Sequence, residues 1–214
     1  MRRFLLIAAM VTAAACAPKA LPLRGVPAPV SAIPAATLPP GHRRLMFHWE
    51  YRDRDVSIKG DGAARIASPD SARLDFVVSG GLGSGHALLL GDTVVAPGGD
   101  LVRRTLPPSP LVWAALGRLA VPAAPDTVVR VDGDTIQAEI GGGGAGNKVV
   151  WRVVFAGTRL VSMERETNGR VREKVTRSPD DEVVFKNPAD RRTLKLSQLR
   201  SETVTEFDPQ VWHR

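Results

Sequence analysis

Residues 73–90 read RLDFVVSGGLGSGHALLL. In the first half, Leu74, Phe76 and Val78 share one face, opposite Arg73 and Asp75. Alternation of apolar and polar residues with a period of two is typical of a strand that buries one face. The stretch therefore predicts a strand that ends in a glycine-rich turn, followed by a second apolar segment, HALLL.

The glycine-rich turn GGLGSG, residues 80–85, fits neither a nucleotide-binding loop nor a catalytic loop. A phosphate-binding loop leads into a helix, whereas HALLL is short and runs into another turn. A nucleophile elbow needs glycines two residues before and after its serine, but Ser84 has Leu82 and His86 at those places. The turn is therefore interpreted as a hairpin tip that carries the apolar Leu82.

Two further segments, 135–140 and 148–155, alternate in the same way. The second carries valines on its other face as well, which makes it a candidate for a strand covered on both sides. Dipeptides suited to tight hairpin turns separate neighbouring segments, namely Gly91-Asp92, Asp132-Gly133 and Asn168-Gly169. The pattern predicts an antiparallel meander that closes on itself wholly or partly.

One segment, SPLVWAALGRLAVP at 109–122, has the signals of a helix instead. Ser109 is the expected N-cap, Pro110 suits the first helical position, and Pro122 is the expected terminator. The segment predicts one amphipathic helix near 109–120, packed across the concave face of the sheet.

The first sixteen residues, MRRFLLIAAMVTAAAC, have the order of a lipoprotein signal peptide: two arginines, an apolar run and small residues before Cys16. Cys16 is the only cysteine of the chain, so no disulfide forms within it. We expect Cys16 to be the lipidation site, and membrane lipid to be a partner through its acyl groups. The alternative is an ordinary secreted protein in which Cys16 is incidental.

Residues 17–41 contain seven prolines and no aromatic residue. Such a segment predicts an extended Pro/Ala-rich tether between the membrane and a folded domain at 42–214. The alternative, an N-terminal strand of the fold, is disfavoured because proline removes donors from a ladder.

Composition argues against several function classes. The net charge is +7, but the basic residues are scattered and aromatic residues make up only 5%, so no nucleic-acid partner is expected. Solvated strand faces are the favoured interpretation of the charge, and attraction to anionic lipid head groups is the alternative. The four histidines form no H-x-x-x-H pair, and no positioned acid–base pair is found. We therefore expect no enzyme activity, no catalytic residue, no metal site and no cofactor.

The layout resembles the LolA/LolB half-barrel superfamily, which includes the outer-membrane lipoprotein receptor LolB. The resemblance rests on the run from 60 to 90, the central helix, the segment LVSMERE, and RRTLKLSQLRSETVTEFDPQVW at 191–212. It implies a mainly β fold: a curved antiparallel sheet that forms an incomplete barrel, with one principal α-helix on its concave side. In this superfamily the apolar cavity takes the acyl chains of lipoproteins.

The resemblance also implies roles for particular residues. Leu82, followed by Gly83, matches an exposed leucine that is thought to enter the membrane, although Leu82 could instead fold back onto its own sheet. Strand phase places four aromatic residues on the cavity side, namely Phe76, Trp113, Trp151 and Phe155.

The sequence thus predicts a membrane-anchored lipoprotein that binds acyl chains or a lipidated cargo in an apolar half-barrel cavity. Ala17 is not the aspartate that commonly retains lipoproteins in the inner membrane, so the periplasmic face of the outer membrane is the expected location. The alternative is a non-catalytic envelope interaction lipoprotein whose cavity is filled by its own side chains and takes no ligand.

Overall fold

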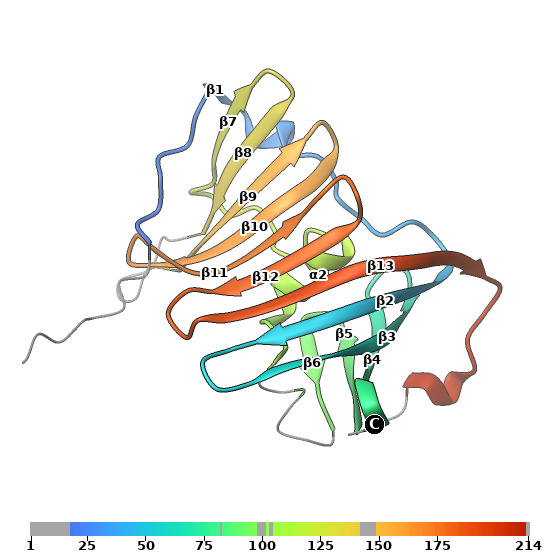
Figure 1. Ribbon diagram of the computed structural model, residues 1–214. Coiled ribbons are helices and arrows are strands. Elements are labelled where there is room, and N and C mark those ends of the chain that lie inside the picture. The colour runs from blue at the N-terminus through green and yellow to red at the C-terminus, as the bar shows by residue number, and fades with distance from the viewer. Residues whose placement is uncertain (1–17, 82, 98–101, 103–104, 142–148, 213–214) are drawn as a thin grey trace, which may run out of the picture.

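The computed structural model describes residues 18–81, 83–97, 102, 105–141 and 149–212. These residues form one antiparallel sheet that curves around a principal helix, α2 (Ser109–Leu116) (Figure 1). The sheet order is β1-β7-β8-β9-β10-β11-β12-β13-β2-β3-β4-β5-β6, and its two ends, β1 and β6, do not pair within the described part of the chain. The predicted incomplete barrel with one principal helix is confirmed.

The strands follow one another as two meanders. The first comprises β2 (His42–Arg52), β3 (Ser57–Ala67), β4 (Ser71–Val78), β5 (Ser84–Leu90) and β6 (Thr93–Val95). The second comprises β7 (Val128–Asp132), β8 (Thr135–Ile140), β9 (Val149–Ala156), β10 (Arg159–Thr167), β11 (Arg170–Arg177), β12 (Glu182–Asn187) and β13 (Arg192–Val204). Antiparallel pairing of β13 with β2 joins the two meanders into one sheet.

The three predicted hairpin turns are confirmed. Gly91 connects β5 to β6, Gly133 connects β7 to β8, and Asn168 with Gly169 connects β10 to β11. All four residues have positive φ values, between 52° and 69°. Tight turns that match the twist of the flanking strands require this conformation, which glycine and asparagine adopt at low cost.

The helix is shorter than predicted, because it ends at Leu116 and not near residue 120. Gly117 follows in the left-handed conformation, with φ of 98°, and its N–H donates to the carbonyl of Ala114. The Arg118 N–H donates to the Trp113 carbonyl, so two of the last carbonyls of the helix are satisfied. The N-cap is Pro108 and not Ser109, and Pro122 lies beyond the true end.

Two glycines on β3, Gly60 and Gly62, allow the neighbouring strands to approach closely. A Cβ atom on Gly60 would overlap the Val77 carbonyl oxygen of β4, and one on Gly62 would overlap the Phe47 ring of β2. Glycines that admit aromatic side chains from the next strand are a known device for bending a sheet.

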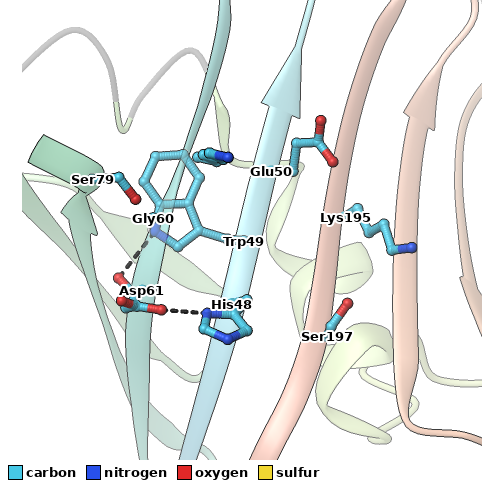
Figure 2. A pocket seen from close by; sticks show the side chains of 9 residues that line it. His48, Trp49, Glu50, Gly60, Asp61, Ser79, Lys195 and Ser197 are labelled. Carbon is cyan, nitrogen blue, oxygen red and sulfur yellow. Dashed lines mark hydrogen bonds and ion pairs between the residues drawn. The ribbon is translucent and has the colours of Figure 1, made fainter.

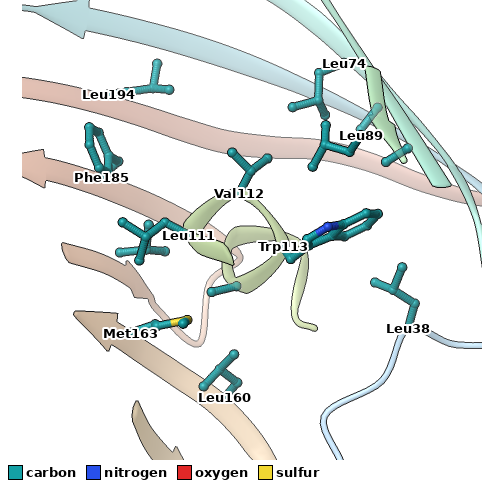
Figure 3. Close-up of a cluster of buried hydrophobic side chains, with 14 of the residues drawn as sticks. Leu38, Leu74, Leu89, Leu111, Val112, Trp113, Leu160, Met163, Phe185 and Leu194 are labelled. Atoms are coloured by element: carbon teal, nitrogen blue, oxygen red, sulfur yellow. The ribbon is translucent and has the colours of Figure 1, made fainter. Parts of the chain in front are cut away.

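The core lies on the concave side of the sheet. The helix packs on β10 and β11, and it inserts Leu111 and Trp113, which are both fully buried, into the cluster that Figure 3 shows. Trp113 Nε1 donates a hydrogen bond of 2.7 Å to the Gly91 carbonyl, which satisfies its one polar atom.

The N-terminal segment differs from the predicted tether. Residues Val26–Ala28 form β1, which pairs with β7 at one edge of the sheet, and Leu38 belongs to the buried core with an exposed fraction of 5%. The Leu119 N–H after the helix donates to the Ala36 carbonyl. The expectation that this segment makes no core contacts is therefore wrong. An edge strand tolerates Pro27 because the missing N–H costs no ladder bond on its open side.

Two 3₁₀ turns flank these elements, η1 (Val30–Ala32) after β1 and η2 (Ser79–Gly81) after β4, and a third, η3 (Pro209–Trp212), follows β13. Within the part of the chain that the structure describes, none of the helices has the length and apolar character needed to cross a membrane. The predicted domain boundary at Cys16 falls outside the described residues and stays a prediction.

Candidate functional site

An apolar pocket of about 160 Å³ lies between α2 and the concave face of the sheet. The helix contributes Val112, Ala115 and Leu116. The apolar wall on the strands consists of Leu45, Phe47, Ala64, Leu74, Val183 and Leu196. An apolar cavity of about 150 Å³ holds one benzene ring, whereas pockets for whole small molecules run from about 300 to 1,000 Å³. In this conformation the pocket therefore accommodates only part of an acyl chain.

Two small residues leave this space open. Ala64 on β3 and Ala115 on α2 each contribute one methyl group to the wall, in positions where a larger side chain would occupy the volume. The main strand contacts of the helix are with β10 and β11, and the gap lies between the helix and the strands from β11 through β13 and β2 to β4. The pocket thus follows from the seating of the helix and from the size of these two side chains.

Polar side chains, Arg43, Arg177, Asp181 and Gln198, complete the lining. Burial lowers the pKa of the Arg177 guanidinium from its ordinary value; the positive charge of Arg159 lowers it further, and Asp181 opposes the shift. The lining therefore combines an apolar wall with guanidinium groups, a combination suited to an amphipathic ligand.

The four aromatic residues predicted for the cavity lie on the concave side but not around this pocket. Phe76, Trp113 and Phe155 are members of the buried core, and Trp151 is partly buried against it. Phe76 packs edge-on against Phe47, with ring centroids 5.8 Å apart, and Phe47 in turn lines the pocket. Their assignment as cavity residues stays a prediction.

The sequence analysis did not identify the pocket residues on β2, although the sequence contains a pattern that indicates them. In β2, residues 43, 45, 47, 49 and 51 point to the concave side, and the first three of them line the pocket. The segment LMFHWEY has the same alternation as the strands that were identified, so strand phase could have identified Leu45 and Phe47.

Leu82 and Cys16 both lie outside the described residues, so the membrane-contact and lipidation sites stay predictions. The described neighbours of Leu82 are consistent with a hairpin tip. Gly81 and Gly83 are exposed, and both have positive φ values, 74° and 136°.

A second pocket, of about 470 Å³, opens on the convex face of β3, β2 and β13 (Figure 2). His48 Nδ1 forms a hydrogen bond with Asp61, and Ser197 stands opposite His48 in the register of β13 and β2. The described contacts include no hydrogen bond between Ser197 and His48, and the His48 and Asp61 side chains are 61% and 66% exposed. The three residues therefore lack the activated nucleophile of a hydrolytic site.

Metal-binding groups are also lacking among the described residues, where no three His, Cys, Asp or Glu side chains are placed to hold an ion. The apolar pocket beside α2 is thus the candidate site with the clearest chemistry.

Comparisons with known proteins agree with this architecture. No family model matches the sequence, and no curated protein matches it. Among solved structures, a LolA superfamily protein from Nitrosomonas europaea superposes with a TM-score of 0.52 at 9% identity, over 84% of this chain and 93% of that one. A putative outer membrane lipoprotein-sorting protein domain from Vibrio parahaemolyticus gives a TM-score of 0.48 at 8% identity, over 81% and 89%. A DUF1329 family protein from Desulfovibrio piger gives 0.46 at 8% identity, over 81% and 90%. The first likeness shows the fold, which is LolA/LolB-like.

Proposed function

We propose that this LolA/LolB-like half-barrel is a non-catalytic cell-envelope protein that takes an acyl chain, from a free lipid or a lipidated cargo, into the pocket beside α2. The observation that carries the proposal is the apolar pocket of about 160 Å³ on the concave side. Each methylene group that leaves water for such a site contributes about 0.8 kcal/mol.

A whole acyl chain requires more room than the pocket now offers, so α2 is the element that moves. The helix has only eight residues, Ser109–Leu116, and its main strand contacts are with β10 and β11, while Trp113 also donates to the Gly91 carbonyl between β5 and β6. A shift of the helix away from β2, β3 and β4 would extend the pocket along the concave face.

The proposal places the protein at a membrane through the acylation of Cys16, on the periplasmic face of the outer membrane. The signal-peptide pattern of residues 1–16 supports this. Two or more acyl chains give stable anchoring, whereas one gives only marginal binding. In this arrangement Leu82, which lies between β4 and β5 in the sequence, would contact lipid during transfer of the cargo.

A second candidate function is favoured by the extent to which α2 fills the half-barrel. Leu111, Trp113 and Ala114 are at most 1% exposed and belong to the core cluster on the concave side of the sheet. A protein with a permanently filled cavity would act as an envelope interaction protein without a ligand. The two functions differ in whether an added chain enters the pocket.

The proposed function is tested with a variant in which a larger side chain occupies the pocket. Ala115→Phe places a ring in the space beside α2, whereas Ala156→Phe makes the same change at an exposed position at the end of β9. Native mass spectrometry and tryptophan fluorescence with two twelve-carbon probes, laurate and 1-dodecanol, should show binding to the wild type and to Ala156→Phe. Binding to Ala115→Phe should be at least about tenfold weaker, because the added ring occupies the site.

Two results would favour the protein without a ligand. One is that neither probe forms an adduct or changes the fluorescence of the wild type up to its solubility limit. The other is that Ala115→Phe, confirmed to be folded by its circular dichroism, binds a probe as well as the wild type does.

A further inference from the structure

Two arginines on different strands belong to the lining of the apolar pocket. Arg43 lies on β2, and Arg177 is the last residue of β11. On β2, Arg43 has the same strand phase as Leu45 and Phe47, so it points to the concave side with them.

The Arg177 side chain carries a partly desolvated charge. Its one hydrogen bond among the described contacts goes from Nη1 to the Leu160 carbonyl, at 3.3 Å. It belongs to no ion pair among the described residues, although burial and Arg159 both lower its pKa and Asp181 is the one acidic residue that lines the pocket. A buried charge without a counter-ion is costly, so such a group favours the approach of an anion.

Gly117 leaves the room for this guanidinium. A Cβ atom at Gly117 would lie 2.9 Å from Arg177 Nη1, which is closer than real Cβ contacts allow. The glycine that ends α2 therefore also lets the Arg177 head group lie against the C-terminal end of the helix, beside Leu116 and the apolar wall.

Arg43 has donors to spare. Its Nη2 donates to Ser201 Oγ at 2.8 Å, and a guanidinium carries five N–H donors in all. Within the described residues Arg43 has no carboxylate partner in an ion pair. A carboxylate between Arg43 and Arg177 would receive charge-assisted hydrogen bonds, which are about twice as strong as neutral ones.

We infer that the ligand of this pocket is a long-chain carboxylate, with its chain against α2 and its carboxylate between Arg43 and Arg177. The inference rests on the proposed function, because it names the chemistry of the polar end of the same ligand. Asp181 at the same site adds a negative charge, which favours a singly charged carboxylate over a doubly charged phosphate.

The test compares two probes with the same chain, laurate and 1-dodecanol, on four forms of the protein. The wild type should bind laurate at least about tenfold more tightly than 1-dodecanol, a difference of about 1.4 kcal/mol. Arg177→Gln and Arg43→Gln should each remove most of this preference, measured as the ratio of the laurate and 1-dodecanol affinities of the same protein. Arg44→Gln is the matched control: Arg44 follows Arg43 on β2 but pairs with Glu202 on the other face of the sheet, so the preference should stay.

The possible results separate the two proposals. Equal binding of laurate and 1-dodecanol by the wild type would overturn the carboxylate inference and leave the acyl-binding function standing. Binding of neither probe would overturn both. A variant Arg177→Gln with a lower melting temperature but an unchanged preference for laurate would show that Arg177 serves only the C-terminal end of α2, where a cation is also favoured. If Arg177→Gln fails to fold, the carboxylate inference is tested by the preference of the wild type for laurate and by the loss of this preference in Arg43→Gln.

Discussion

Arg152 and Glu166 form a buried ion pair on neighbouring strands, β9 and β10. Arg152 Nε lies 3.3 Å from Glu166 Oε1, and its Nη2 lies 2.5 Å from Glu139 Oε1. Arg152 and Glu166 are 8% and 4% exposed; Val150 and Val154, on the same face of β9 as Arg152, are partly buried, and the expectation of a strand covered on both sides stays a prediction. Burial raises the pKa of Glu166; Arg152 opposes the rise, and the charges of Glu139 and Glu164 add to it.

This raised pKa predicts a pH dependence of stability. The folded protein binds a proton on Glu166 more tightly than the unfolded chain does, so the free energy of unfolding falls as pH rises from about 4.3, the ordinary pKa of glutamate, through the raised value. Glu166→Gln should remove this part of the slope. The measurement is the thermal midpoint of both proteins between pH 4 and pH 8.

The control for this experiment is Glu206→Gln, because Glu206 is exposed after the end of β13. Its pH profile should follow that of the wild type. Identical profiles for Glu166→Gln and the wild type would contradict the effect of burial on this carboxylate.

For helices and strands, local sequence signals predicted the hairpin turns correctly. They did not predict a strand whose formation depends on pairing with a segment far away in the sequence. Gly133 forms the turn between β7 and β8 with Asp134, and its positive φ is a local backbone preference, so the turn could be identified from sequence although Asp132 belongs to β7. Gly117 is a local signal as well, and it ends α2 before Pro122, the predicted terminator, is reached. In contrast, β1 exists because it pairs with β7, about a hundred residues away. No pattern within 17–41 contains that information, and seven prolines argue against it.

Because part of the N-terminal segment packs in the core, substituting two of its leucines by alanine should change the free energy of unfolding by unequal amounts. Leu38→Ala should lower the free energy of unfolding by about 2–5 kcal/mol, because Leu38 is 5% exposed and packs in the core. Leu21→Ala should change it by less than about 0.5 kcal/mol, because Leu21 is 70% exposed. Chemical denaturation of both variants provides the measurement, and equal stabilities would restore the interpretation of a free tether.

At the scale of the whole molecule, the sequence predicted the open, curved antiparallel sheet with its helix, and it placed Phe76, Trp113 and Phe155 on the buried concave side. The pocket could not be predicted in the same way. Its position depends on how α2 is seated over β10 and β11, which is a property of the packed molecule. Strand phase identifies residues that face inward, but it does not say which of them border empty space.

The proposed membrane anchor at Cys16 also concerns the whole molecule. It predicts that loss of this cysteine changes the cellular fraction in which the protein is found. Cys16→Ser removes the thiol that would receive the lipid, so the protein should leave the membrane fraction or accumulate as the uncleaved precursor. Ala17→Ser keeps the cysteine and should behave like the wild type. Fractionation with immunoblotting measures the cellular fraction and the gel mobility of both variants. A Cys16→Ser protein that partitions and migrates like the wild type would contradict the prediction that the protein is a lipoprotein.

The pairing of β13 with β2 also sets the order in which the chain folds. Apart from this pair and the β1–β7 pair, neighbours in the sheet are consecutive in sequence, so both meanders consist of hairpins that close quickly. The β13–β2 pair instead joins residues as distant as Arg43 and Ser201, 158 positions apart. Closing such a long loop is slow, and β13 is synthesised after all the other described strands. Until it docks, the eleven-residue edge of β2 is open to other chains, so a chain that stalls before residue 192 leaves that edge free to aggregate.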